Sequence, residues 1–212
     1  GIYGVSYFLG KRKNKQIALD MLSKIAVPIQ PYCDSFEKVT QEKDRFQLVC
    51  NTSDDAPMKA MIVLAIPLGR PYFIAFIWDK IKKKRDKYTL SATLAKRPPF
   101  SIEILSRKKK KVIKSDQDYF MELKELQTTG FLHEYFIIKT NDKRKATKML
   151  SNRRILELLA QTREETLWLS LREDIQDVGM QFESIFEYEE EQIENTVELF
   201  TTCIESIPYP YK

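Results

Sequence analysis

Apolar residues recur at helical spacing near both ends of the chain. Around residues 13–27 they follow i, i+3, i+4 spacing, which predicts a helix that ends at Pro28. The same spacing predicts a final helix over 189–207. The first stripe consists of Ala18, Met21, Leu22, Ile25 and Ile29, and the second of Ile193, Val197, Phe200, Ile204 and Ile207. Each helix needs a surface on which to bury its stripe.

Alternation of apolar and polar residues predicts strands between these helices. It is clearest at 45–51, 88–94 and 166–171. Residues 58–66 form a nearly continuous apolar run, which predicts a central strand buried on both faces. Further strands are predicted at 100–105, 134–140 and 180–188.

Shorter helices are expected at 72–84 and 116–126, and a pair of helices follows Asp142, the first capped by that residue and the second starting at Ser151. Because helices and strands do not alternate strictly, the predicted class is α+β, with one or more mixed sheets packed against amphipathic helices. The predicted globular domain covers 13–207. Division into sub-lobes 13–111 and 115–207 is an alternative to one compact core.

The first residues combine apolar and aromatic side chains with a basic cluster. Residues 1–9 read GIYGVSYFL, and KRKNK follows at 11–15. This order is typical of the cytosolic exit of a membrane helix, with Tyr3, Tyr7 and Phe8 at the membrane interface. A simple amphipathic first element is the alternative. No apolar run approaches the ~20 residues that span a bilayer.

The chain does not begin with Met, so we expect it to be a fragment of a longer protein. In that interpretation, residues 1–12 are a membrane-exit segment and the globular domain is the water-facing part behind the anchor. Residues 208–212 begin a C-terminal extension.

Composition supports a packed core, and the number and spacing of the cysteines bear on whether they are free thiols or form disulfides. Hydrophobic residues make up 43% of the 212 residues and aromatic residues 11%, which excludes global disorder. The 3 cysteines, Cys33, Cys50 and Cys203, are far apart and odd in number. That pattern favours buried thiols in a reducing compartment over a disulfide framework.

The sequence lacks the motifs of common catalytic sites. Its 6 glycines match no phosphate-binding loop, and His133 is the only histidine. We therefore expect no enzyme activity, no cofactor, no metal and no small-molecule substrate. The catalytic alternative is a site assembled from Asp116, Asp118, His133 and Glu134.

Positive charge is concentrated in runs. The net charge is only +5, with 35 Lys+Arg against 30 Asp+Glu, yet the basic residues gather in four clusters. Such clusters indicate a polyanionic partner, either phospholipid head groups or RNA phosphates, with solvated surface as the alternative. The predicted binding residues are Lys11, Arg12, Lys13, Lys15, Lys80, Lys82, Lys83, Lys84, Arg85, Lys87, Arg107, Lys108, Lys109, Lys110 and Lys111. The remaining cluster is Lys143, Arg144, Lys145, Lys148, Arg153 and Arg154.

The segment 7–18, YFLGKRKNKQIA, resembles the segment just after the membrane helix in the calumin family. Calumin is the coiled-coil-domain protein of the PAT intramembrane-chaperone complex of the endoplasmic reticulum. The order of later elements is also similar, including the strand FQLVC at 46–50 and a strand that ends in Arg107 and Lys108. The central region 112–135 matches the family poorly, and the family's C-terminal coiled coil and luminal acidic segment lie outside this sequence.

The resemblance implies a cytosolic domain at the membrane of the endoplasmic reticulum, beside the protein-conducting channel and under a translating ribosome. There the family helps multi-pass membrane proteins to insert, together with a small membrane-protein partner. The basic runs would then contact ribosomal RNA or lipid head groups. The alternatives are a membrane-tethered domain that binds anionic lipids and a purely structural interaction domain.

Overall fold

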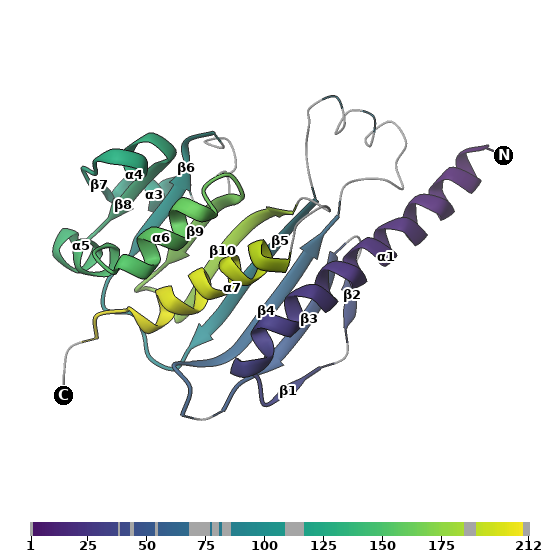
Figure 1. Ribbon diagram of the computed structural model, residues 1–212, viewed down its shortest axis with the longest axis horizontal. Coiled ribbons are helices and arrows are strands. Elements are labelled where there is room, and N and C mark those ends of the chain that lie inside the picture. Colours follow the sequence, from purple (N-terminus) through teal and green to yellow (C-terminus); the bar gives the residue numbers. More distant parts are fainter. Residues whose placement is uncertain are drawn as a thin grey trace.

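A computed structural model describes residues 2–37, 39–42, 45–53, 55–67, 77, 81, 86–108, 117–184 and 190–209. The strands form one large sheet, and the longest helices lie across one of its faces (Figure 1). The predicted α+β class is therefore confirmed. The helices are α1 (Ile2–Ile29), α3 (Gln117–Glu122), α4 (Gly130–Tyr135), α5 (Lys143–Leu150), α6 (Arg153–Gln161) and α7 (Glu190–Glu205), with the 3-10 helix η1 (Gln30–Tyr32).

The sheet has ten strands in the order β1-β3-β4-β5-β10-β9-β6-β8-β7, and β2 also pairs with β3. Every pairing among the described strands is antiparallel, so the predicted mixed sheet is wrong. Strands that follow each other closely, such as β3 and β4, return beside one another, and short returns give antiparallel pairs. The strands are β1 (Ser35–Phe36), β2 (Thr40–Glu42), β3 (Arg45–Asn51), β4 (Met58–Ile66), β5 (Asp86–Leu94), β6 (Ile102–Ser106), β7 (Lys124–Glu125), β8 (Phe136–Thr140), β9 (Thr166–Leu171) and β10 (Asp177–Ser184).

The core lies between the sheet and the two long helices predicted from their apolar stripes. Both stripes are buried, and α1 and α7 also contact each other. Tyr88 of β5 stacks on Phe182 of β10, with ring centroids 5.1 Å apart. The Tyr88 hydroxyl is hydrogen-bonded to Thr196 of α7 at 2.6 Å. This bond satisfies a polar group inside the core, where burial raises the pKa of Tyr88 well above its ordinary value.

Most predicted strands are confirmed, but β4 is not buried on both faces. Met61 and Val63 are fully buried, whereas the alternate residues Ile62 and Leu64 are half-buried. The continuous apolar run therefore conceals ordinary alternation: only one face of this strand lies beneath α1.

The helix predicted to start at Ser151 starts at Arg153, and the final helix ends at Glu205. Three other boundaries differ more from prediction. Helix α1 starts at Ile2 and ends at Ile29, so Pro28 lies in its last turn, and the membrane-exit segment 1–12 is not separated from it by a break. The helix predicted at 116–126 is cut short because 124–125 pair with β8 as an edge strand. The first residues of the strand predicted at 134–140 belong instead to α4.

The segment 72–84, with its predicted helix, lies outside the described residues except for 77 and 81, and so do 185–188. Within the described part of the chain, no helix is both long and apolar enough to cross a membrane. The sheet continues through both ranges proposed as sub-lobes, because β5 pairs with β10. The division into sub-lobes itself stays a prediction.

The prediction that the cysteines are buried thiols is wrong for two of the three. Cys33 and Cys50 form a disulfide with Cα atoms 5.5 Å apart, whereas Cys203 is a buried thiol whose pKa is raised by burial. The pairing follows from the fold, since η1 turns the chain so that β1 runs beside the end of β3 and Phe36 pairs with Cys50. A separation of 17 residues in sequence gave no sign of this.

Candidate functional site

The first half of α1 extends past the edge of the sheet (Figure 1). Phe8 and Leu9 lie on this part of the helix with 74% and 61% of their surface exposed. Tyr7 packs beside Phe8, and the Lys11 ammonium lies 5.0 Å from the centre of the Tyr7 ring. Large apolar side chains thus lie on a helix without being buried by this chain.

The predicted basic cluster of α1 follows directly and is also exposed. Its residues are Lys11, Arg12, Lys13 and Lys15. From residue 7 onward, where side chains are described, the first buried residues are Asn14 and Ile17, and the helix packs onto the sheet after them. The structure therefore joins the predicted interface residues Tyr7 and Phe8 to the first predicted polyanion site in one surface, here called the α1 surface. The side chain of Tyr3 lies outside the described residues.

The other predicted polyanion-binding residues do not form a described surface. Lys87 is half-buried in β5. Arg107 donates a hydrogen bond through Nε to the carbonyl of His133 at 2.6 Å. Lys108 is paired with Glu164 at 2.5 Å, and its ammonium lies 5.5 Å from the centre of a tyrosine ring. The rest lie outside the described residues: Lys80, Lys82, Lys83, Lys84, Arg85, Lys109, Lys110 and Lys111.

A second exposed basic surface is built on the helix pair α5 and α6. Ala146, Met149 and Leu150 of α5 are buried, which turns the polar side of the helix outward. The exposed cations, here called the α5–α6 face, are Lys143, Arg144, Lys148, Arg153 and Arg154. The sequence showed this cluster without placing it among the predicted binding residues. The absence of any Asp or Glu between 143 and 156 was the signal that could have done so.

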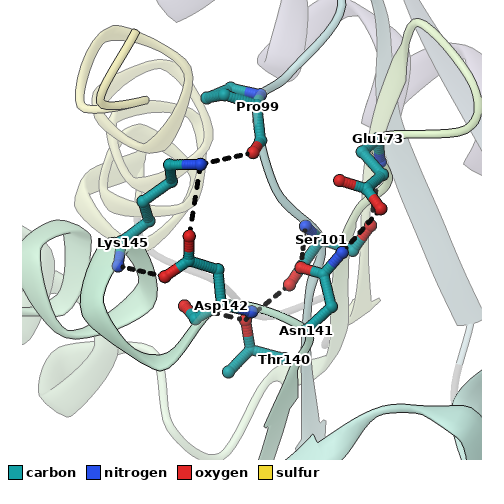
Figure 2. A network of polar contacts seen from close by, with 7 residues as sticks. All are labelled: Pro99, Ser101, Thr140, Asn141, Asp142, Lys145 and Glu173. Atoms are coloured by element: carbon teal, nitrogen blue, oxygen red, sulfur yellow. Dashed lines mark hydrogen bonds and ion pairs between the residues drawn. The ribbon is translucent and has the colours of Figure 1, made fainter. Parts of the chain in front are cut away.

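The one remaining cation of the cluster, Lys145, is used to hold α5 in place (Figure 2). Its Nζ donates to the carbonyl of Pro99 at 2.9 Å and lies 3.2 Å from Oδ2 of Asp142. The Lys145 backbone N–H donates to Oδ1 of Asp142, which caps the helix. This backbone bond, followed by the bond from the Lys145 side chain, lowers the pKa of Asp142.

Figure 2 shows how this cap is joined to the sheet. The Thr140 hydroxyl donates to the carbonyl of Ser101 at 2.6 Å, and the Ser101 N–H donates to Oδ1 of Asn141 at 2.8 Å. The amide of Asn141 donates to Glu173 at 2.6 Å, whose own N–H donates to the Ser101 hydroxyl at 2.9 Å. The start of β6, the end of β8 and the loop after β9 are thereby fixed to one another beneath α5.

Ion pairs divide the α5–α6 face into two groups. Arg153 bonds Glu157 at 2.8 Å, and Arg154 bonds both carboxylate oxygens of Glu198 at 2.5 Å. The latter pairing lowers the pKa of Glu198 and raises that of Arg154. Within the described part of the chain, the exposed cations of α5, at 143, 144 and 148, form no ion pair. Their charge is therefore available to a partner.

The residues of the catalytic alternative are only partly described. His133 and Glu134 are exposed on α4, a short helix at the edge of the sheet. Asp116 and the side chain of Asp118 lie outside the described residues. Among the described residues, no group of three His, Cys, Asp or Glu side chains is placed to hold a metal ion.

Comparison with known proteins gives little beyond these observations. No protein-family model matches the sequence, and no curated protein matches it. Among solved structures, the chain is similar to the mycobacterial trehalose monomycolate transport factor A, TtfA, with 10% identity and a TM-score of 0.36. The match covers 82% of this chain and 74% of that one. A likeness at this level carries no information about function.

Proposed function

We propose that the chain is a non-catalytic docking domain of a membrane protein of the endoplasmic reticulum. It works on the cytosolic face, beside the protein-conducting channel and the ribosome, and assists the insertion of multi-pass membrane proteins. The resemblance of residues 7–18 to the calumin family supports the setting. The observation that carries the proposal is the α1 surface, where exposed Phe8 and Leu9 precede a run of exposed cations.

The physical argument concerns what such a surface is suited to touch. Exposed aromatic and aliphatic side chains gain free energy at the boundary between head groups and acyl chains. Cations placed just behind them meet the negative potential of the cytosolic leaflet. Phe8 and Leu9 would therefore lie at the bilayer or against a small membrane-protein partner, with Lys11 to Lys15 at the level of the head groups.

Site-specific photocrosslinking in microsomes tests this placement. A photoreactive residue at Leu9 should crosslink to lipid, to the channel or to a small membrane protein, and more strongly while ribosomes synthesise multi-pass proteins. Met121 of α3 is a matched control, because 67% of its surface is exposed against 61% for Leu9. Identical products from both positions, or no dependence on the nascent chain, would refute the proposal.

The second candidate is a membrane-tethered domain that binds anionic lipids and has no ribosomal role. The same cations favour it, because four of them lie within one stretch of α1 beside exposed apolar residues. The two candidates separate in microsomes whose ribosomes are removed. Loss of the crosslinks to channel components supports the ribosome–channel setting, whereas unchanged crosslinks to lipid alone support the lipid-binding domain.

The pair Cys33 and Cys50 gives an independent test of the side of the membrane. The cytosol keeps such pairs reduced, whereas oxidising compartments maintain disulfides. A cytosolic location therefore predicts that this pair, which is disulfide-bonded in the structure, is a dithiol in the cell. Rapid alkylation of intact cells followed by mass spectrometry measures this directly. A predominantly oxidised pair would contradict the cytosolic location.

A further inference from the structure

The α5–α6 face differs from the α1 surface in what surrounds its charges. Phe8 and Leu9 accompany the cations of α1, whereas none of the exposed large apolar side chains of the described residues lies in α5 or α6. Exposed Thr147 lies among the cations instead, and Ser151 follows it, with its hydroxyl donating to the carbonyl of Lys148. Cations interspersed with hydroxyl donors suit a phosphodiester backbone, which accepts hydrogen bonds and offers no apolar interior.

We propose that the α5–α6 face binds the phosphate backbone of folded RNA, with Lys143, Arg144 and Lys148 as its principal contacts. Phosphate contacts of this kind carry no base specificity and depend on the number of cations engaged. Arg153, although paired with Glu157, has 92% of its side chain exposed and extends the face onto α6. The face would therefore recognise RNA by its charge and shape and not by its base sequence.

Rigidity of the support favours a folded, extended polyanion. Helix α5 is held by buried Met149 and Leu150 and by the cap and bonds of Asp142 and Lys145. Only the side chains of the exposed cations therefore lose conformational freedom when a partner binds. Arg144 and Lys148 are four residues apart on one helix, which separates them by about 6 Å along its axis and allows them to contact separate phosphates.

The position of the face in the molecule favours RNA over a membrane. Figure 1 shows α5 and the free end of α1 at opposite ends of the long axis of the molecule. This step rests on the proposed function, which places the α1 surface at the bilayer. With the free end of α1 at the membrane, α5 lies at the far end of the long axis, on the side on which a ribosome would lie.

The experiment uses the purified chain, a fluorescent RNA hairpin and a salt titration. Triple replacement Lys143→Gln, Arg144→Gln and Lys148→Gln should weaken RNA binding at least tenfold. Each phosphate contact contributes roughly 0.7 to 0.9 to the magnitude of the slope of log affinity against log salt concentration. The magnitude of this slope should therefore decrease by roughly 2 to 3 in the triple variant. The matched control Lys11→Gln, Arg12→Gln and Lys13→Gln removes equal charge from α1 and should retain RNA affinity within about twofold, as expected for residues outside the contact.

Vesicles containing phosphatidylserine provide the second readout. The α1 variant should lose vesicle binding, and the α5 variant should keep it. Three results would overturn the inference: no RNA binding by the unmodified chain at low salt, unchanged affinity and slope in the α5 variant, or loss of vesicle binding in that variant. Failure of the α1 variant to affect vesicles contradicts only the proposed membrane placement, so the two failures are distinguishable. Circular dichroism confirms that both variants are folded.

Discussion

The two basic surfaces have similar charge and different surroundings. On α1 the cations follow exposed Phe8 and Leu9, at the end of a helix that extends beyond the sheet. On α5 the cations stand on a short helix that is capped by Asp142 and bonded through Lys145 to the carbonyl of Pro99, just before β6. A run of lysines in a sequence therefore indicates only that a polyanion would be attracted, and does not identify the polyanion. In our proposal, the neighbouring apolar surface and the rigidity of the support distinguish a surface that binds lipid from one that binds RNA.

The largest expected effect concerns the disulfide, which fixes the end of α1 and leaves α5 unconstrained. Replacing Cys33 and Cys50 together with Ala should lower the free energy of unfolding by about 3 kcal/mol, from loss of a closed loop of this length. Urea unfolding measures the loss. Reductant should bring the unmodified chain to the stability of the double variant.

Two readouts make this prediction specific to α1. Amide exchange should increase near the end of α1 and in β1, while protection in α5 stays unchanged. The stability of the double variant should not respond to reductant. Because this variant retains the buried thiol Cys203, it also controls for any effect of reductant on that residue. Equal stability of the oxidised and reduced chain would show that the bond adds no stability to the attachment of α1.

The next effect separates the surfaces by their apolar content. Changing Phe8 and Leu9 to Asp should weaken binding to phosphatidylserine vesicles by at least ~30-fold, or about 2 kcal/mol. Full burial of one such side chain contributes roughly 1.5 to 3 kcal/mol, and insertion into the interface buries each of the two only in part. RNA affinity should change little. Vesicle flotation and hairpin binding measure the two. Val27→Asp is the control, since Val27 has 67% of its surface exposed but lies in the last turn of the same helix, far from the free end. A similar loss in that variant would show that added charge, rather than position, is responsible.

The sequence predicted the parts of the fold that depend on local periodicity. The stripe of α1, the strands 45–51 and 166–171 and the cap at Asp142 lie where the pattern placed them. The pattern could not tell that β10 lies between β5 and β9, because strand neighbours depend on long-range pairing. For the same reason the pattern missed the approach of Cys33 to Cys50, which follows from the pairing of β1 with β3.

The candidate site was predicted less completely, for a related reason. Composition identified the cations, but only tertiary contacts distinguish the cations that bond other groups of the chain from those that are exposed and unbonded. Arg107 and Lys108 belonged to one of the predicted binding clusters, yet they bond His133 and Glu164. Within the α5–α6 cluster, Lys145 is bound to Pro99 and Asp142, whereas its neighbour Arg144 is exposed. A helical projection would separate these two side chains, but it could not identify the carbonyl of Pro99 as a partner.

The smallest expected effect tests whether the support of α5 responds to pH while the α1 surface does not. Hydrogen bonds from Lys145 lower the pKa of Asp142 below its ordinary value of 3.8. A carboxyl group whose pKa is lower in the folded chain contributes stability that is present above its unfolded pKa and is lost as the pH falls through the folded pKa. The Asp142→Asn variant keeps a capping side chain and removes the titrating charge. At pH 7 it should melt a few degrees below the unmodified chain, and this difference should vanish as the pH falls below 3.8.

Protection of the Lys145 amide, measured by NMR and corrected for intrinsic exchange, localises the effect to α5. Between pH 5 and lower values, protection in the unmodified chain should decrease toward that of Asp142→Asn, while α1 amides near Asn14 behave alike in both chains. A difference in melting temperature that persists unchanged at low pH would mean that the ionised carboxylate contributes nothing to the support. The α5–α6 face would then owe its rigidity to the burial of Met149 and Leu150 and to the bond from Lys145 to Pro99, and RNA binding should be insensitive to replacement of Asp142.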